Sequence, residues 1–362
     1  MLLLLAVSAR LRKTIRRHVR DGWARAVFMT PGEDDSEVVE GPAGAPSEAQ
    51  VEALVERAEA AAKAGRVKQT FVLDERTRVR SDARHGRAKV QTLDDATVKK
   101  MMGGKERVLR PDTSGALLRT IGIANADGSI SAQHAKKYKQ VNHFVELCRP
   151  TLERLQASPL RIFDLACGNG YLTFVLAEAL RLQQRAAEIR GIDVRPDVVD
   201  RCRARASELH WPHLSFDVGA IRDADLGERP DLVLALHACD TATDEALAKA
   251  IRAEARAIFV APCCQRELAT QLDAGHVPTP ALHDVGLLRR DYAATLTDAL
   301  RIEILHACGY QVDALEFVAS EHTPKNLLLR AHEHRARGSL DTVARRCASL
   351  GVRPTLLDLL LA

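Results

Sequence analysis

The stretch Phe163-Asp164-Leu165-Ala166-Cys167-Gly168-Asn169-Gly170-Tyr171 decides the fold of this chain. It continues the short apolar start at residues 161–162 and precedes an apolar run at residues 172–182, so it predicts a strand, a tight glycine turn and a helix. Gly168 and Gly170 permit a positive φ, or the close approach of a ligand to the backbone. The first N–H groups of the following helix would then face that ligand.

An acidic residue ends the next apolar segment, Ile189-Arg190-Gly191-Ile192-Asp193-Val194. A carboxylate at this position can accept hydrogen bonds from both hydroxyls of a ribose. A turn with two glycines is weak evidence by itself, because many turns after strands contain two. Its spacing to Asp193 is typical of nucleotide-binding folds, and this favours a ligand site over a purely structural turn.

Strands and helices are expected to alternate from residue 161 onward. The expected strands are 161–166, 188–194, 214–218, 231–237 and 256–261, and the expected helices are 171–183, 196–208, 243–253, 265–272 and 287–307. Two last strands, 311–319 and 326–331, would form a hairpin. This alternation predicts an α/β fold with a largely parallel sheet covered by helices on both faces. Ligands of such folds bind outside the carboxyl ends of the strands.

The organisation of the whole chain is predicted from shifts in composition. We expect a small basic α+β accessory domain at residues 1–104, a connector and pre-core helix at 105–160, the core at 161–335 and a helical tail at 336–362. In the accessory domain, strands are expected at 23–29, 69–73 and 89–93. The acidic segment 31–47, which is rich in Gly, Pro and Ser, is expected to be a loop.

Charge is distributed unevenly along the 362 residues, although the net charge is only +4. Residues 1–150 contain 27 Lys and Arg against 19 Asp and Glu, whereas the remainder contains 25 against 29. A basic front end favours a polyanionic partner, RNA or DNA. The alternative, in which these charges are solvated helix faces, stays open. Aromatic residues make up 4% of the chain, which argues against a platform that stacks single-stranded bases.

Cysteine use and the N-terminus indicate where the protein works. The eight cysteines contain no C-x-x-C repeat and have no secretory context, so we expect reduced thiols in a cytoplasmic protein. The apolar residues 1–7 have no basic segment before them and are soon followed by Arg10, which indicates an amphipathic helix rather than a signal peptide. Since no apolar run approaches the length of a bilayer span, no membrane partner is expected.

The pattern Asp164-x-Ala166-x-Gly168-x-Gly170 resembles the first motif of class I S-adenosylmethionine (SAM)-dependent methyltransferases, whose common form is Asp/Glu-x-Gly-x-Gly-x-Gly. Here Ala166 replaces the first glycine. The expected hairpin at the end also resembles this class, and the resemblance implies a Rossmann-like, seven-stranded sheet whose last strand is antiparallel. It implies SAM as cofactor, with contacts from Asp164, Cys167, Gly168 and Gly170 at its amino-acid end, from Asp193 and Val194 at the ribose, and from Val218, Ala220 and Ile221 at the adenine.

Two further clusters resemble a narrower group. The segment Leu236-His237-Ala238-Cys239-Asp240-Thr241 and the later Pro262-Cys263-Cys264 are similar to a group of "methyltransferase domain" proteins. That group includes the methyltransferase-like 25 proteins and, more distantly, the tRNA 2′-O-methyltransferases of the acceptor stem. The resemblance covers about residues 105–335 and points to a bacterial-type member. It implies SAM binding and methylation of RNA.

Four residues are candidates for catalysis: His237, Asp240, Lys325 and Asn326. The topology predicts that the last hairpin turn, 321–326, lies on the same rim as the ends of the parallel strands. His237 or Asp240 would remove a proton from the methyl acceptor, and Lys325 would contact a phosphate or an acceptor hydroxyl. The alternative for His237 is a purely structural hydrogen bond.

The adjacent cysteines Cys263 and Cys264 have two interpretations. Cys263 or Cys264 would serve as a nucleophile that adds to a pyrimidine, or both are buried structural thiols. A zinc site made by these two with His237 and Cys239, and with His276 as a further candidate ligand, has poor spacing for a tetrahedron, so no metal is expected.

The sequence therefore predicts a SAM-dependent methyltransferase that acts on RNA, either tRNA or rRNA. One alternative is a SAM-dependent methyltransferase of a small molecule or a protein. The other is a catalytically degenerate SAM-fold binding protein, a scaffold whose SAM pocket has itself degenerated.

Overall fold

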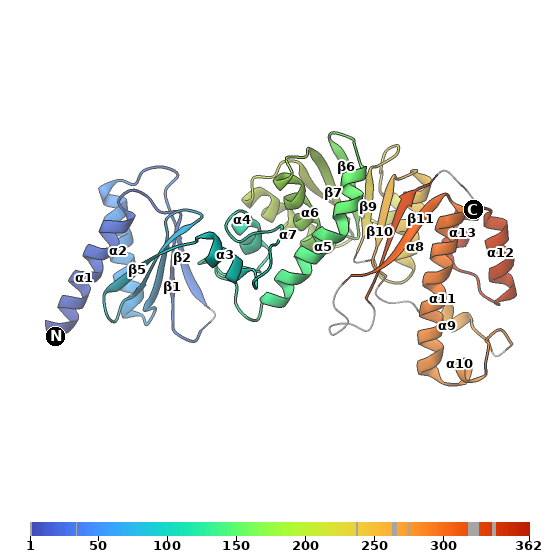
Figure 1. Cartoon of the computed structure of the whole chain (residues 1–362), viewed down its shortest axis with the longest axis horizontal. Coiled ribbons are helices and arrows are strands. Elements are labelled where there is room, and N and C mark those ends of the chain that lie inside the picture. The colour runs from blue at the N-terminus through green and yellow to red at the C-terminus, as the bar shows by residue number, and fades with distance from the viewer. Residues whose placement is uncertain are drawn as a thin grey trace. The chain divides into compact units, whose positions relative to one another are not determined.

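The structure is a computed structural model that describes residues 2–33, 35–236, 238–262, 266–273, 275–317, 326–334 and 338–362. The chain divides into two compact units, Met1–Tyr138 and Lys139–Ala362. Figure 1 shows the course of the chain through both units. No helix among these described residues is long and apolar enough to cross a membrane.

The first unit is built on a five-stranded antiparallel sheet in the order β2-β1-β3-β4-β5. Its strands are β1 (Arg25–Met29), β2 (Ser36–Glu40), β3 (Lys68–Val72), β4 (Thr77–Asp82) and β5 (Arg87–Thr92). Its helices are α1 (Leu2–Val19), α2 (Glu48–Lys63), α3 (Asp95–Met101) and α4 (Gly115–Thr120). The core of this unit lies where α1 and α2 pack on the sheet, and the rings of Phe28 and Phe71 meet there edge to face, 6.1 Å apart.

Two strands of this sheet were not predicted from the sequence. β2 lies inside the segment 31–47 that we expected to be a loop, because a five-residue edge strand of Ser, Glu and Val is hidden between Gly- and Pro-containing flanks. β4 covers the basic stretch between two expected strands. Its alternation of arginine and valine did not indicate a buried face, yet both Arg78 and Val79 are buried.

The second unit is built on a seven-stranded sheet in the order β11-β12-β10-β9-β6-β7-β8. Its strands are β6 (Leu160–Leu165), β7 (Ala187–Asp193), β8 (Leu214–Val218), β9 (Leu232–Ala235), β10 (Ala257–Val260), β11 (Tyr310–Glu316) and β12 (Leu327–Glu333). β6 to β10 pair in parallel, whereas β12 is antiparallel to both β10 and β11. The prediction of a Rossmann-like α/β fold with seven strands and an antiparallel last strand is confirmed.

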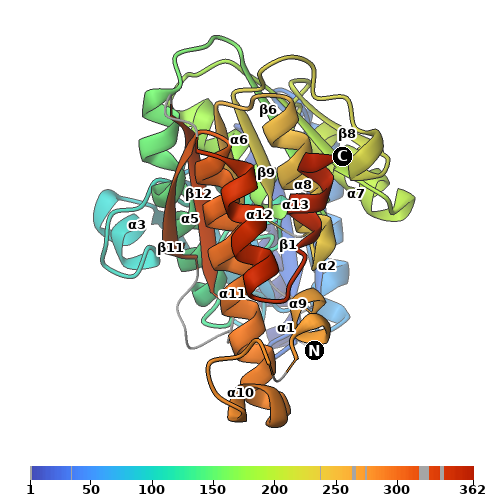
Figure 2. The ribbon, with the colours of Figure 1, turned by 90° about the vertical axis from the view of Figure 1, so that its right-hand side faces the viewer.

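Helices cover both faces of this sheet. They are α5 (Ala135–Arg154), α6 (Tyr171–Leu182), α7 (Pro196–Glu208), the 3₁₀ turn η1 (Ile221–Asp223), α8 (Thr241–Arg252), α9 (Glu267–Gln271), α10 (Ala281–Asp284), α11 (Gly286–Ala307), α12 (Leu340–Ser349) and α13 (Thr355–Leu361). Figure 2 looks onto the layer of α8, α11, α12 and α13 in front of the sheet. Buried side chains of α12 and α13, such as Val343 and Leu356, belong to the core under this layer.

The carboxyl ends of β6, β7, β8, β9 and β10 meet at one edge of the sheet, which we call the rim. The start of β12 lies at the same edge, because Leu329 pairs with Val260 at the end of β10, which in turn pairs with Ala235 at the end of β9. The order of the strands thus brings the ends of β6 and β7 to the same edge as the start of β12. This is the edge where open α/β sheets bind ligands.

Candidate active site

The turn after β6 winds through three residues with positive φ: Ala166 at 56°, Gly168 at 59° and Gly170 at 67°. The N–H of Cys167 donates to the carbonyl of Ile192 at 3.0 Å, and the N–H of Gly170 donates to the carbonyl of Cys167 at 3.0 Å. These bonds join the turn to the end of β7. The turn therefore presents backbone rather than side chains at the start of α6.

Ala166 has a left-handed backbone, which costs an L-residue about 1 kcal/mol. The substitution Ala166→Gly should relieve this strain and raise the free energy of unfolding by about 1 kcal/mol, measured by urea denaturation. The same change in the exposed, helical Ala204 of α7 is the control and should lower stability by about 0.5–1 kcal/mol. Equal losses at both positions would contradict the strain at Ala166.

Gly170 is required by packing as well as by its backbone angle. A Cβ at this position would lie 3.0 Å from Cys202 Sγ and 3.1 Å from Phe216 Cε1. The next strand is equally tight, because a Cβ on Gly191 would lie 2.6 Å from Phe216 Cδ1. Both glycines make room for Phe216 of β8, and Gly170 also makes room for Cys202 of α7, so the turn and β7 pack closely against these two elements.

Asp164 is buried directly beneath this turn. Its Oδ2 accepts a hydrogen bond from the Thr173 hydroxyl, whereas its Oδ1 has no partner among the described residues. Burial raises the pKa of Asp164 to about 7, against the hydrogen bond from Thr173 and with help from the nearby Asp193 charge. A buried carboxylate with one orphaned oxygen favours a positively charged ligand group nearby.

Asp193 ends β7 and connects two parts of the site. Its Oδ2 accepts the Gly168 N–H at 2.9 Å, and its Oδ1 accepts the N–H and the Nε of Arg195 at 3.1 and 2.9 Å. Although burial raises its pKa, the hydrogen bonds from Arg195 and Gly168 hold the pKa of Asp193 below its ordinary value. Asp193 therefore stays ionised near neutral pH. Sequence reasoning missed Arg195, and its only signal was its position two residues after the acidic strand end.

The remaining predicted cofactor contacts differ in exposure. Val194 directly follows β7 and Val218 ends the neighbouring β8, and these side chains are 63% and 47% exposed. Ala220 is half-buried and Ile221 is buried in the core. Cys167 is fully buried, burial raises the pKa of its thiol, and its backbone N–H and carbonyl are bonded to Ile192 and Gly170, so Cys167 supports the turn from inside.

These features fit a cofactor that combines a nucleoside with a cationic end. The orphaned oxygen of Asp164 suits a positive group, and Asp193 suits ribose hydroxyls once Arg195 moves aside. The two exposed valines offer apolar contact to a base. The side chains thus match the chemistry of SAM, which carries a sulfonium and an amino group.

Two of the four predicted catalytic residues lie among the described residues. Asp240 is the N-cap of α8, with φ 52° and ψ −124°, and its Oδ1 accepts the backbone N–H of Arg266 at 3.1 Å. Asn326 is half-buried and directly precedes β12. Both follow or precede strands at the rim. The other two candidates, His237 and Lys325, lie outside the described residues, as do Cys263 and Cys264.

Sequence reasoning also missed the support beneath Asp240. Arg301 of α11 is buried and binds the Asp244 carboxylate with two hydrogen bonds, of 2.8 and 2.7 Å. Its Nη2 also donates to the Asp240 carbonyl at 3.2 Å. A buried arginine in a long helix carries no sequence signal, because charged residues normally indicate an exposed face.

A metal site is not found in the part of the chain that the structure describes. There, no group of three or more His, Cys, Asp or Glu side chains is arranged to hold a metal ion. Of the five zinc candidates, His237, Cys263 and Cys264 lie outside the described residues, whereas Cys239 and His276 lie among them.

Comparison with known proteins identifies similar sequences and structures. Residues 136–271 match a protein family described as "Methyltransferase domain". This match covers the turn after β6, the end of β7 and the Asp240 segment, and it places this segment in the class of SAM-dependent methyltransferase domains.

Individual relatives are distant. The chain is 27% identical over 89 residues to malonyl-[acyl-carrier protein] O-methyltransferase of Anoxybacillus flavithermus, a match that covers 25% of this chain and 32% of that protein. The chain thus spans about a third of the length of this relative.

Two solved structures are also similar. Magnesium protoporphyrin IX methyltransferase from Synechocystis with bound SAM has 14% identity and a TM-score of 0.38, over 60% of this chain and 90% of that one. A putative RNA methyltransferase from Pyrococcus horikoshii has 15% identity and a TM-score of 0.32, over 54% and 84% of the two chains.

Proposed function

We propose that this chain is a SAM-dependent methyltransferase that acts on RNA. The observation that carries the proposal is the pairing of a positive-φ turn with two acidic side chains, the orphaned Asp164 and the strand-end Asp193. This combination supports a cationic nucleoside cofactor at the rim. The match of residues 136–271 to a methyltransferase domain supports the same reading.

Two groups of residues at the rim would have different roles, one binding the cofactor and the other facing the methyl acceptor. Asp164, Asp193 and the backbone of Gly168 would hold the cofactor, which supplies an activated methyl group when bound. Asp240 and Asn326, with His237 and Lys325, would face the acceptor. A carboxylate or imidazole there can take the proton that the acceptor loses, and holding the acceptor in line contributes most of the rate.

Exposed cations in the first unit support RNA as the substrate. Arg87 and Lys89 point from β5, an edge strand, and Lys99 and Lys100 lie at the end of α3. All four are exposed, and among the described residues none forms a side-chain hydrogen bond or ion pair. Cations that are not neutralised by the protein itself are available to phosphates.

A salt titration tests the RNA substrate. RNA affinity of the wild-type chain should fall steeply as salt rises, and Arg87→Gln/Lys89→Gln should reduce the slope of log K against log salt by about one or two. Arg289→Gln/Arg290→Gln on α11 removes the same charge from the second unit and serves as the control. If wild type, the Arg87/Lys89 double variant and the Arg289/Arg290 double variant all have the same slope, β5 is not the RNA contact.

The alternative substrates are a small molecule or a protein, and the matched relative acts, by its name, on a malonyl-acyl carrier protein. Mass spectrometry of nucleosides from cells without the protein separates these options, because only an RNA enzyme leaves a missing methylated nucleoside. Calorimetry with SAM tests the degenerate alternative. No SAM binding would favour that alternative over both enzymes. A cytoplasmic location stays a prediction from cysteine use.

A further inference from the structure

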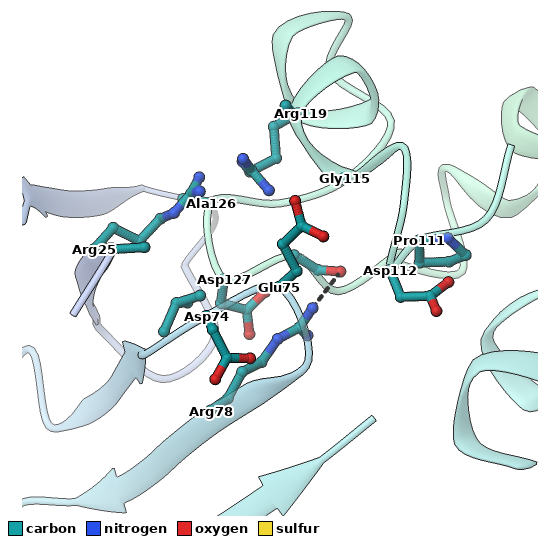
Figure 3. A pocket seen from close by; sticks show the side chains of 14 residues that line it. Arg25, Asp74, Glu75, Arg78, Pro111, Asp112, Gly115, Arg119, Ala126 and Asp127 are labelled. Carbon is teal, nitrogen blue, oxygen red and sulfur yellow. Dashed lines mark hydrogen bonds between the residues drawn. The ribbon is translucent and has the colours of Figure 1, made fainter. Parts of the chain in front are cut away.

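A cavity of about 240 Å³ lies within the first unit and has no role in the site described above. Its walls come from the start of β1 with the residue before it, from the end of β3, the β3–β4 turn and β4, and from the segment that contains α4. Figure 3 shows Arg25, Arg78 and Arg119 reaching this space from those three segments. The cavity is several times larger than the roughly 30 Å³ that one water occupies, so it can hold a polyatomic group.

Arg78 is the unusual residue of this cavity. It is only 4% exposed, yet among the described residues no carboxylate lies within ion-pair distance of its guanidinium. Its Nη2 donates a long hydrogen bond of 3.4 Å to the Gly128 carbonyl, and its Nε has no partner there. Burial lowers the pKa of Arg78, with Arg80 and Arg25 also acting against its charge and Asp127 partly offsetting them. A buried cation without a counter-charge is costly, and proteins normally pair it.

The chain is built closely around this guanidinium. Gly128 has φ +76°, and a Cβ there would lie 2.5 Å from Arg78 Nη2 and 3.0 Å from its Cζ. Only glycine therefore lets the backbone lie against the guanidinium. This contact fixes one side of Arg78 and leaves the other directed at the cavity that it lines (Figure 3).

Carboxylates also line the cavity, but three of the four are already engaged. Asp112 accepts from Arg76 at 2.6 Å and from Arg110 at 3.1 Å. Asp127 pairs with Arg80 at 3.3 Å and accepts the N–H of Ser129 at 2.9 Å.

The other two carboxylates lie in the β3–β4 turn. Asp74 accepts two backbone N–H groups of its own turn, both at 2.7 Å. Glu75 is exposed at the edge of the cavity and forms no ion pair among the described residues. None of the four thus neutralises Arg78 at close range.

We propose that this cavity binds a phosphate group, with Arg78 as its buried counter-charge and Arg25 and Arg119 as flanking donors. A tetrahedral oxyanion offers several acceptors to guanidinium groups that converge from three directions. That the phosphate belongs to RNA rests on the proposed function. That the cavity binds a phosphate group does not depend on the proposed function. A free phosphorylated small molecule would satisfy the same residues.

Calorimetry with inorganic phosphate on the full chain tests the site without SAM or methylation. We expect Arg78→Met to weaken phosphate binding at least about tenfold. The control Arg290→Met removes an exposed arginine from α11 in the second unit and should leave phosphate affinity unchanged. Glu75→Gln should tighten binding severalfold, because it removes a negative charge at the edge of the cavity. Wild-type protein that does not bind phosphate, or an Arg78→Met variant that binds it as well as wild type, would overturn the proposal.

A stability measurement separates this role from a structural one. Since methionine removes an uncompensated buried charge at similar volume, Arg78→Met should raise Tm by a few degrees in phosphate-free buffer. A lower Tm together with unchanged phosphate binding would make Arg78 a structural residue and overturn the site.

A competition experiment tests the source of the phosphate. Two RNA oligonucleotides of the same sequence, one with and one without a 5′-phosphate, are added to the protein in the presence of inorganic phosphate. Competition between the RNA and inorganic phosphate supports the RNA source. Phosphate binding that neither oligonucleotide displaces supports a small-molecule source, and it leaves the site standing even if RNA methylation fails.

Discussion

SAM affinity should rise about tenfold per pH unit between pH 5 and 7 and level off above pH 7, and Asp164→Asn should remove this dependence. The reason is the pKa of about 7 that burial gives the Asp164 carboxyl. A cationic ligand binds the ionised carboxylate better than the neutral acid, so binding below pH 7 must first release a proton. Calorimetry with SAM at several pH values measures this effect.

The same pKa affects the stability of the ligand-free protein in the opposite direction: SAM affinity rises with pH, whereas the free energy of unfolding falls. The folded pKa lies above the unfolded value of 3.8, so the folded state holds this proton more tightly. The stabilisation is complete below pH 3.8 and is lost as the pH rises through 7, by up to about 4 kcal/mol. Asp164→Asn should therefore be more stable than wild type at pH 8. Asp197→Asn, an exposed change on α7, is the control, and a shared pH profile of all three proteins would exclude Asp164 as the titrating group.

Asp164 and Asp193 show how far sequence reasoning reached. The order of strand, glycine turn, helix and acidic strand end is local, and each part follows from residue types within about 30 positions. For this reason the second sheet, its parallel strands and the positions of both carboxylates near the ends of these strands could be predicted. The pairing of Asp193 with Arg195 and Gly168 could not, because it depends on atomic distances across the turn.

Residues whose burial or backbone angle is unusual for their residue type were harder to predict. Arg78 and Arg301 are buried although arginine normally indicates solvent, and Ala166 has a backbone angle that normally indicates glycine. The sequence of β2 contains too few apolar residues to be distinguished from that of a loop. In each case the surrounding structure overrides the local preference, and only the folded chain reveals it.

The second large effect is expected at Arg301, in the core of the second unit. Asp244→Ala should lower the free energy of unfolding by about 3–5 kcal/mol, because it removes the carboxylate that binds the buried guanidinium. The Asp298 carboxylate, 3.5 Å from Nη1, is too weakly placed to replace it. Chemical denaturation of wild type and variant measures the loss. A change below 1 kcal/mol would mean that the guanidinium finds water when its partner is gone.

A double variant separates stability from positioning. Asp244→Leu/Arg301→Met replaces the ion pair with apolar side chains and should recover most of the lost stability. It also removes the hydrogen bond from Arg301 to the Asp240 carbonyl, which holds Asp240 in its strained conformation at φ 52°. We therefore expect the double variant to fold and to bind SAM like wild type, yet to lose methyl transfer at least tenfold in kcat. Full activity in a stable double variant would show that Asp240 needs no support from Arg301.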